Sequence, residues 1–493
     1  MITDRGTGTP RVRARTPWFV LLALVTLCLM LFKLGDAPIR RHSEARVHAV
    51  SRTMVQSGDY LVPYLDGAPR LQKPPLYYWA TSLASIGEDD VSHFRLRLTS
   101  ALSSVLLLLL VRRWGASALG PAGGILAASV LLLMDQFWTN GRRGDAEMLL
   151  TLCCTAALLC FDRMYFDARR RLLPWFALLC TLSFLAKATV ALLVIGLPIA
   201  VWISIERRWS AVFRRDVLLW MGAAAGASLS WYVATLIFVP GALEKFRSAL
   251  LIPVGSHSLE SDAAHYRPFY FFFLELPQVL GAALLLLPCV LLRAGRLLRS
   301  DEPRIRFLFL SCVELFLAFT LLPAKQAHYL LPILPMLAIV MAESFSGLVR
   351  EHLPPARLWL QRYAFVWLVA GSVATLLCSA YLAFPLGERL LCWSAAAVAG
   401  GTLTIAGFRA AKAARLKLLG SVAMALWLFL IVPVMLSVEL WQDRFATGAA
   451  KECADFHEQR WTGLFETLPF LRTTMHFQHP SAQKGQETGA VPR

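Results

Sequence analysis

Long apolar runs recur along most of the 493-residue chain, and short polar clusters separate them. A helix needs about 20 apolar residues to cross a bilayer. By this criterion we predict thirteen transmembrane spans, at residues 17–34, 96–112, 117–135, 146–162, 172–186, 188–205, 217–239, 269–292, 307–323, 328–348, 363–384, 389–408 and 418–440. The pattern therefore predicts an all-α polytopic membrane protein.

The basic residues support this order of spans, because they gather in alternate connections. Four arginines precede the first span, and further clusters lie at 112–113, 163–171, 207–215, 293–306, 350–362 and 409–417. Short cytoplasmic loops carry an excess of Lys and Arg. We therefore expect a cytoplasmic N-terminus and, because the number of spans is odd, a periplasmic C-terminus.

Two long connections are expected on the periplasmic side, at 35–93 and 240–268. Residues 43–56, SEARVHAVSRTMVQ, place Val47, Val50 and Met54 on one stripe, which predicts an amphipathic helix on the membrane face with Ser43 as its N-cap. Residues 70–79, RLQKPPLYYW, hold a lysine beside two prolines and three aromatic residues. We expect residues 1–440 to form the transmembrane domain and 441–493 to form a short, partly disordered periplasmic tail.

Composition narrows the class of protein further. The chain is 57% hydrophobic and 16% charged, as expected for a membrane protein. A net charge of +17 would suit nucleic acid only if the cations formed one patch, and here they are spread between spans. Nine of the ten cysteines lie in or beside apolar runs, so no disulfide framework is expected.

Nine ionisable residues lie at the predicted periplasmic edge, where a charge is costly unless it reaches water, pairs or has a function. They are Glu44, Arg46, Lys73, Asp145, Lys187, His265, Arg267, Lys325 and His328. Each alone has a plain structural explanation. A lysine at a span end can extend to the interface, Asp145 can cap a helix, and Glu44 can pair with Arg46 or His48. It is their convergence from distant segments on one membrane face that indicates a site.

Many cations with few carboxylates favour an anionic ligand, and phosphate is the expected anion at a lipid surface. Aromatic residues and rigid proline turns suit a long apolar chain, so the set indicates a phosphorylated polyprenyl lipid. A nearby carboxylate then acts as base on an acceptor oxygen while cations stabilise the departing phosphate. The alternative is a lipid or solute transporter, which predicts ionisable groups near the bilayer midplane and related halves. A membrane scaffold would need none of these residues.

The segment SEARVHAVSRTMVQSGDYLVPYLDGAPRLQKPPLYYW resembles the first outer loop of the bacterial lipid A aminoarabinose transferases and of the wider dolichyl-phosphate-mannose protein mannosyltransferase-like group. The resemblance covers residues 18 to 345 and continues, in the same order, in FRLRLTSAL, RRGDAEMLL, FLAKATVALL, SWYVATL, HYRPFYFFF and PAKQAHYLLPILP. It implies the GT-C fold of membrane glycosyltransferases. It also implies transfer of a sugar from a polyprenyl-phosphate donor to a lipid A-like, glycan or protein acceptor on the periplasmic face of a bacterial inner membrane.

The resemblance also implies roles for the residues at this edge. Glu44 would activate or orient the acceptor, and Asp145 would position the acceptor or the cations. The donor phosphate would be held by Arg46, Lys73, Lys187, His265, Arg267, Lys325 and His328. Where many relatives have Asp-Glu, this chain has Ser43-Glu44, and Gln72 replaces an acidic residue before Lys-Pro-Pro. No cofactor is therefore assigned and a divalent cation is left open, as are the sugar and the acceptor.

Overall fold

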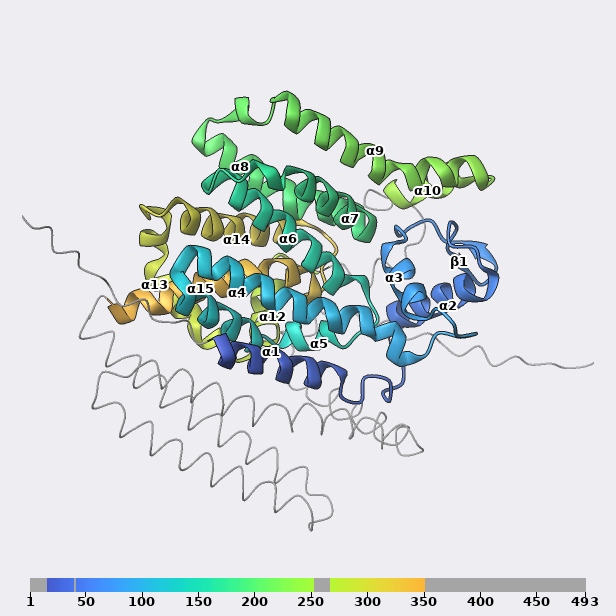
Figure 1. Ribbon diagram of the computed structural model, residues 1–493, viewed down its shortest axis with the longest axis horizontal. Coiled ribbons are helices and arrows are strands. Elements are labelled where there is room, and N and C mark those ends of the chain that lie inside the picture. The colour runs from blue at the N-terminus through green and yellow to red at the C-terminus, as the bar shows by residue number, and fades with distance from the viewer. Residues whose placement is uncertain (1–15, 40, 252–266, 351–493) are drawn as a thin grey trace, which may run out of the picture. The chain divides into compact units, whose positions relative to one another are not determined.

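The computed structural model describes residues 16–39, 41–251 and 267–350, all within one compact unit (Figure 1). The three last predicted spans, the tail 441–493 and His265 lie outside the described residues. The described chain is helical apart from one short hairpin. This agrees with the predicted all-α class.

The first half of the described chain runs from α1 to α8. Its elements are α1 (Thr16–Leu31), α2 (His42–Ser57), β1 (Tyr64–Leu65), β2 (Ala68–Pro69), α3 (Leu76–Ala84), α4 (His93–Leu132), α5 (Asp135–Gly141), α6 (Ala146–Phe166), η1 (Arg170–Leu172), α7 (Leu173–Ala191), η2 (Leu192–Gly196) and α8 (Leu197–Glu206).

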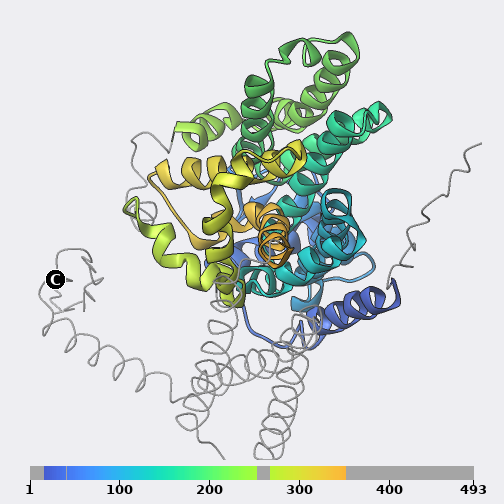
Figure 2. The ribbon, with the colours of Figure 1, turned by 90° about the vertical axis from the view of Figure 1, so that its left-hand side faces the viewer.

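The second half adds η3 (Trp209–Ala211), α9 (Arg215–Phe238), α10 (Ala242–Leu251), α12 (Phe271–Leu280), η4 (Gly281–Leu286), α13 (Leu287–Leu298), α14 (Pro303–Leu321), η5 (Ala327–Ile333) and α15 (Leu334–Arg350). Helices α7 to α10 occupy one side of the bundle, as Figure 2 shows in green. Helix α15 packs against α4, α13 and α14.

Six stretches of the described chain are long and apolar enough to cross a membrane. They are His93–Leu132, Ala146–Phe166, Arg170–Glu206, Arg215–Phe238, Phe271–Leu298 and Ala327–Leu348. Two of them, with 40 and 37 residues, are far longer than the roughly 20 residues that one crossing needs. Each of these two contains a break where two separate spans were predicted.

The break in α4 lies at Gly120, whose φ of +79° is open to glycine, and Pro121 follows it. Behind the break, Gly124 lies against the Arg112 carbonyl and the Ala116 side chain. Residues twelve apart would be about 18 Å apart along a straight helix. The chain therefore turns back at Gly120, and α4 consists of two packed halves. Two spans were predicted here, but the turn lies inside the predicted span 117–135 instead of before it.

The break in α7 lies at Lys187, where φ is −164° and ψ is 87°. Lys187 contacts Glu147 at the start of α6, whereas Trp202 of α8 packs on Tyr165 and Phe166 near the end of α6. The chain thus runs along α6 once in each direction before α9 begins. This agrees with separate spans at 172–186 and 188–205. We call the two ends of these helices the Lys187 end and the Arg304 end.

The Arg304 end collects several of the basic connections. Arg304 donates to Asp162 at 3.0 Å, to Asp167 at 2.6 Å and to the Ser117 carbonyl at 3.0 Å. These contacts tie α4, α6 and α14 together at the end where the charge pattern places the cytoplasm. Asp162 is fully buried, so its pairing with Arg304 is required to keep the charge tolerable.

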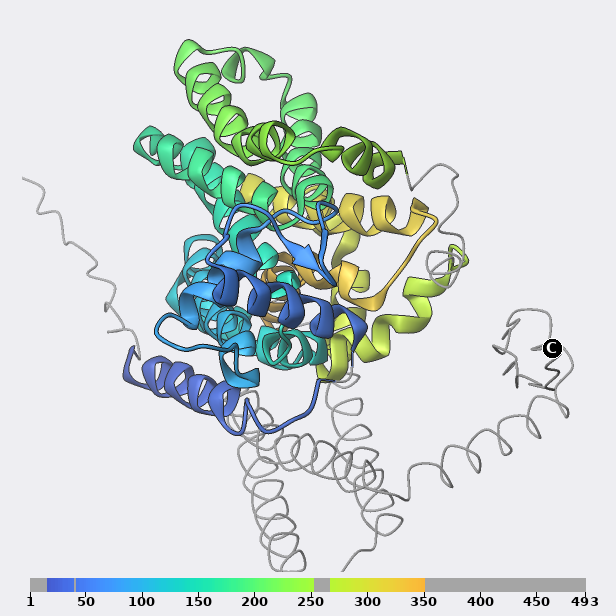
Figure 3. The ribbon, with the colours of Figure 1, turned by 90° about the vertical axis from the view of Figure 1, so that its right-hand side faces the viewer.

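The loop 35–93 lies across the Lys187 end, with α2 in front in Figure 3. Helix α2 covers the predicted amphipathic segment, and Val47, Val50 and Met54 are buried in one cluster with Tyr77 and Tyr78 of α3. The predicted N-cap was wrong. Arg41 occupies that position without a side-chain cap, and Ser43 lies inside the first turn, where its hydroxyl donates to Asp145 at 3.0 Å.

Candidate functional site

Two lysines from distant segments are positioned by one apolar cluster. Leu71 of the loop and Leu185 of α7 are both buried in a cluster with Trp231 of α9 and Phe246 of α10. The Trp231 indole also donates to the Leu61 carbonyl at 2.9 Å. Lys73 and Lys187 each follow a leucine of this cluster by two residues, so packing in the cluster sets where both ammonium groups lie.

Lys187 is held in a network that joins α6, α7 and η5. Its ammonium donates to the Glu147 carboxylate at 2.7 Å and lies 5.2 Å from the centre of the Tyr329 ring. The His328 ring nitrogen lies 3.5 Å from the same Glu147 oxygen. The charge of Lys187 is therefore already balanced by Glu147.

Lys73 differs, because it makes no hydrogen bond or ion pair with the described residues. Burial lowers the pKa of its ammonium, and so does the neighbouring charge of Lys187, while Glu147 and Asp145 act in the opposite direction. Pro74 and Pro75 are buried beside it, and α3 begins immediately after them. The structure thus presents a rigidly held cation with its donors free.

Asp145 faces Lys73 from the N-terminus of α6. Burial raises the pKa of its carboxyl, and Lys73 and the Ser43 hydroxyl act against that rise. Its backbone carbonyl accepts from the Ser100 hydroxyl at 3.1 Å, and Ser100 is itself bonded to the Tyr77 hydroxyl at 2.8 Å. The carboxylate and the backbone of Asp145 are therefore both fixed.

A second cation, the guanidinium of Arg143 between α5 and α6, has no hydrogen-bond partner among the described residues. Burial lowers the pKa of its guanidinium to about 10, and Arg41 adds to this, while Asp145 and Glu44 oppose it. Lys73 and Arg143 thus both lie near Asp145, as two cations whose side chains can bind an anion. An anion bound there would relieve the electrostatic cost of holding both.

Glu44 lies near this group but its carboxylate is engaged elsewhere. It is 5% exposed, accepts from Arg97 at 2.7 Å and accepts from the Gly144 amide at 2.9 Å. The partner foreseen from the sequence was Arg46 or His48 on the same helix. The actual partner is 53 residues further along the chain.

The remaining predicted residues differ in their contacts and in their exposure. Arg46 donates to the carbonyl of His42 on its own helix. Lys325 donates to the carbonyls of Arg267 and Leu322, at 3.0 and 2.5 Å, and so holds two irregular segments together. Arg267 is exposed. The structure therefore brings together Lys73, Asp145, Lys187 and His328, and gives Lys325 a backbone contact instead.

Sequence reasoning missed Glu147, Arg143 and Arg97. Glu147 is in the quoted motif RRGDAEMLL, two residues after Asp145, and its position as the second residue of a predicted span was the available signal. Arg143 had a signal too, because its charge lies at the periplasmic edge against the general pattern. Arg97 had none, since FRLRLTSAL offers two arginines and the sequence does not distinguish them.

Glu147→Gln is expected to lower the free energy of unfolding by about 3–5 kcal/mol, because it leaves the Lys187 ammonium without its anion in a mostly buried place. Thermal unfolding in detergent, followed by tryptophan fluorescence, measures this. Lys187→Met should have a similar effect, and the double variant should lose less than the two single losses added together. Additive losses would contradict the pairing.

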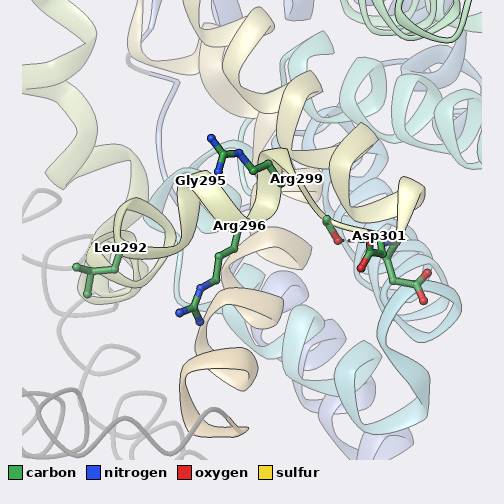
Figure 4. Close-up of a pocket in the computed structure, with 7 residues that line it drawn as sticks. Leu292, Gly295, Arg296, Arg299 and Asp301 are labelled. Atoms are coloured by element: carbon green, nitrogen blue, oxygen red, sulfur yellow. Dashed lines mark hydrogen bonds between the residues drawn. The ribbon is translucent and has the colours of Figure 1, made fainter.

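No group of three or more His, Cys, Asp or Glu side chains within residues 16–39, 41–251 and 267–350 is placed to hold a metal ion. A hollow of about 670 Å³ occurs elsewhere, at the connection of α13 and α14 (Figure 4). Arg296 and Arg299 project around it, with Asp301 beyond. It lies at the Arg304 end and is separate from the group around Lys73.

The chain is similar in sequence to known glycosyltransferases. The family model described as dolichyl-phosphate-mannose-protein mannosyltransferase matches residues 72–231, which contain Lys73, Asp145 and Lys187. The undecaprenyl phosphate-alpha-4-amino-4-deoxy-L-arabinose arabinosyl transferase of Pectobacterium carotovorum is 31% identical over 72% of this chain and 64% of its own length. The enzyme of the same name from Edwardsiella ictaluri is 28% identical over 68% of this chain and 60% of its own.

The crystal structure of ArnT from Cupriavidus metallidurans in the apo state superposes with a TM-score of 0.67 and 18% identity. It covers 85% of this chain and 75% of ArnT. The chain is therefore similar in sequence to the ArnT-like membrane glycosyltransferases and has their GT-C fold. The family resemblance and the GT-C fold predicted from the motifs are confirmed, and the chain is a multi-pass protein of the bacterial inner membrane. It spans somewhat less than two thirds of the length of the two curated ArnT-like relatives.

Proposed function

We propose that this ArnT-like chain transfers a sugar from a polyprenyl-phosphate donor to a lipid A-like, glycan or protein acceptor on the periplasmic face. The observation that carries the proposal is the pair of half-buried cations Lys73 and Arg143, whose side chains have no hydrogen-bond partner among the described residues and which both lie near Asp145. The relatives' names include an undecaprenyl-phosphate sugar, and one ArnT structure is bound to undecaprenyl phosphate. Both support the choice of a polyprenyl donor.

The chemistry follows from the charges. The Asp145 carboxylate takes the proton of an acceptor hydroxyl, whose oxygen attacks the anomeric carbon of the sugar. The bond from that carbon to the phosphate oxygen breaks, and the leaving polyprenyl phosphate gains one negative charge. Lys73 and Arg143 balance that charge as it develops, which lowers the barrier more than it strengthens donor binding.

Lys187 and His328 act behind this pair in the proposal. Because Glu147 neutralises Lys187, the positive field of Lys187 at the phosphate is reduced, but its position next to Lys73 is secured. Arg46 and Arg267 are proposed to contact the phosphate only after a change of their side-chain position. With the N-terminus in the cytoplasm, as the charge pattern predicts, the Lys187 end faces the periplasm.

The test is transfer of radiolabelled sugar by the purified protein from undecaprenyl-phosphate-linked 4-amino-4-deoxy-L-arabinose and from an undecaprenyl-phosphate-linked hexose. Lipid A, a polysaccharide and a peptide are offered as acceptors in separate reactions. We expect labelled product with one donor–acceptor pair. Movement of the labelled donor across vesicle membranes without transfer to any acceptor would overturn the proposal in favour of a transporter.

A further inference from the structure

Glu44 is the acidic residue expected from the sequence to activate or orient the acceptor, and its surroundings indicate another role. Both carboxylate oxygens face Arg97, at 2.7 and 3.4 Å. The oxygen nearer to Arg97 also accepts from the Gly144 amide at 2.9 Å. A carboxylate that is 5% exposed and holds these donors would have to give up its ion pair to take a proton from a substrate.

The Arg97 guanidinium is also engaged in several hydrogen bonds. It is 4% exposed and donates to the carbonyls of Leu34 and Ala37 at 2.9 and 2.7 Å, besides its two contacts with Glu44. It therefore joins the segment that follows α1 to α2 and α4. The result is a neutral, hydrogen-bonded pair whose geometry is set by three parts of the chain.

The hydrogen bond from the Gly144 amide to Glu44 connects the Glu44–Arg97 ion pair to the proposed site. A side chain at Gly144 would meet Leu96 at 2.5 Å, so glycine allows the turn before α6 to lie close against α4. The next residue is Asp145, whose carbonyl is bonded to Ser100 of α4 and whose carboxylate is bonded to Ser43 of α2. Ser43 and Glu44 are adjacent, and both hold the same turn.

We propose that Glu44 is a positioning residue, which holds the Gly144 amide from its ion pair with Arg97 and so fixes the carboxylate of Asp145 that receives the acceptor proton. This rests on the proposed function, since it assigns the base of that reaction to Asp145. Ser43 completes the arrangement by orienting the carboxylate directly. Ser43 thus acts on the Asp145 carboxylate by a direct hydrogen bond, and Glu44 acts on it through the Gly144 amide.

Two substitutions separate positioning from proton transfer. Glu44→Gln retains an oxygen that accepts from Gly144, whereas Glu44→Leu removes it. A positioning role predicts that kcat falls about tenfold in Glu44→Gln and at least tenfold further in Glu44→Leu. It also predicts that the acidic limb of the pH profile of kcat/KM is retained in Glu44→Gln. A base would give equal losses in both variants, each of about 10²–10⁴-fold, and would remove the acidic limb.

The assay uses the full-length protein, with undecaprenyl-phosphate-linked 4-amino-4-deoxy-L-arabinose or the hexose donor, whichever the unmodified protein transfers. Thermal unfolding of each variant shows whether it is folded. If Glu44→Gln is unfolded because Arg97 has lost its anion, Glu44→Gln with Arg97→Gln removes the orphaned charge and is compared with Glu44→Leu with Arg97→Gln. Equal loss in folded variants overturns the inference, whereas no transfer by the unmodified protein overturns the proposed function.

Discussion

Lys73→Met is expected to reduce kcat by at least about 100-fold, the usual cost of losing one donor that stabilises developing negative charge. The variant should fold, because the Lys73 ammonium holds no hydrogen bond with the described residues and its removal relieves a partly desolvated charge. Transfer of labelled sugar, with thermal unfolding as the check on folding, measures both effects.

Two further variants make the result specific to Lys73. Arg52→Met removes the same charge from a half-exposed residue of α2 that pairs with Asp90 at the surface, and should leave transfer unchanged. Lys73→Arg keeps the charge with a different shape and should recover only part of the activity. Full activity in Lys73→Met would remove this lysine from the site.

Asp145→Asn is expected to reduce kcat by about 10²–10⁴-fold, because the amide cannot take the acceptor proton. The substitution preserves size, and the new side-chain oxygen can still accept from Ser43, so the fold should be retained. Labelled transfer at saturating donor measures the loss, and unchanged donor binding would place the effect in the chemical step.

The pH profile provides a second check on Asp145. Because burial raises the pKa of this carboxyl, the base becomes protonated at a higher pH than an ordinary aspartate. Activity should therefore rise with pH through the raised pKa and reach a plateau above it. An acidic limb that is unchanged in Asp145→Asn would assign the titration to another group.

Much of the fold follows from the sequence because its signals are long and regular. The apolar runs and alternate basic clusters predict two spans in each of the two longest helical stretches. The break at Lys187 lies between two predicted spans, whereas the break at Gly120 lies just inside the predicted span 117–135. The helix at 43–56 is predicted by its stripe of Val47, Val50 and Met54, which the structure buries together. Its first residue is not, because a serine near a helix start can bond elsewhere, and Ser43 bonds to Asp145.

The partners of the charged residues are less predictable. Glu44 pairs with Arg97 and Lys325 with backbone carbonyls, and both outcomes depend on which segments pack together. Lys325 lies in an irregular stretch whose backbone carbonyls need hydrogen-bond donors, and its ammonium supplies them. Convergence at one membrane edge is readable from sequence, whereas the choice of partner at that edge is a property of the tertiary structure.

The most direct test of the central claim is an experimental structure of the protein with undecaprenyl phosphate bound. The phosphate is predicted to lie within hydrogen-bond distance of the Lys73 ammonium and the Arg143 guanidinium, beside Asp145. A phosphate bound instead at Arg296 and Arg299, near the connection of α13 and α14, would contradict the account.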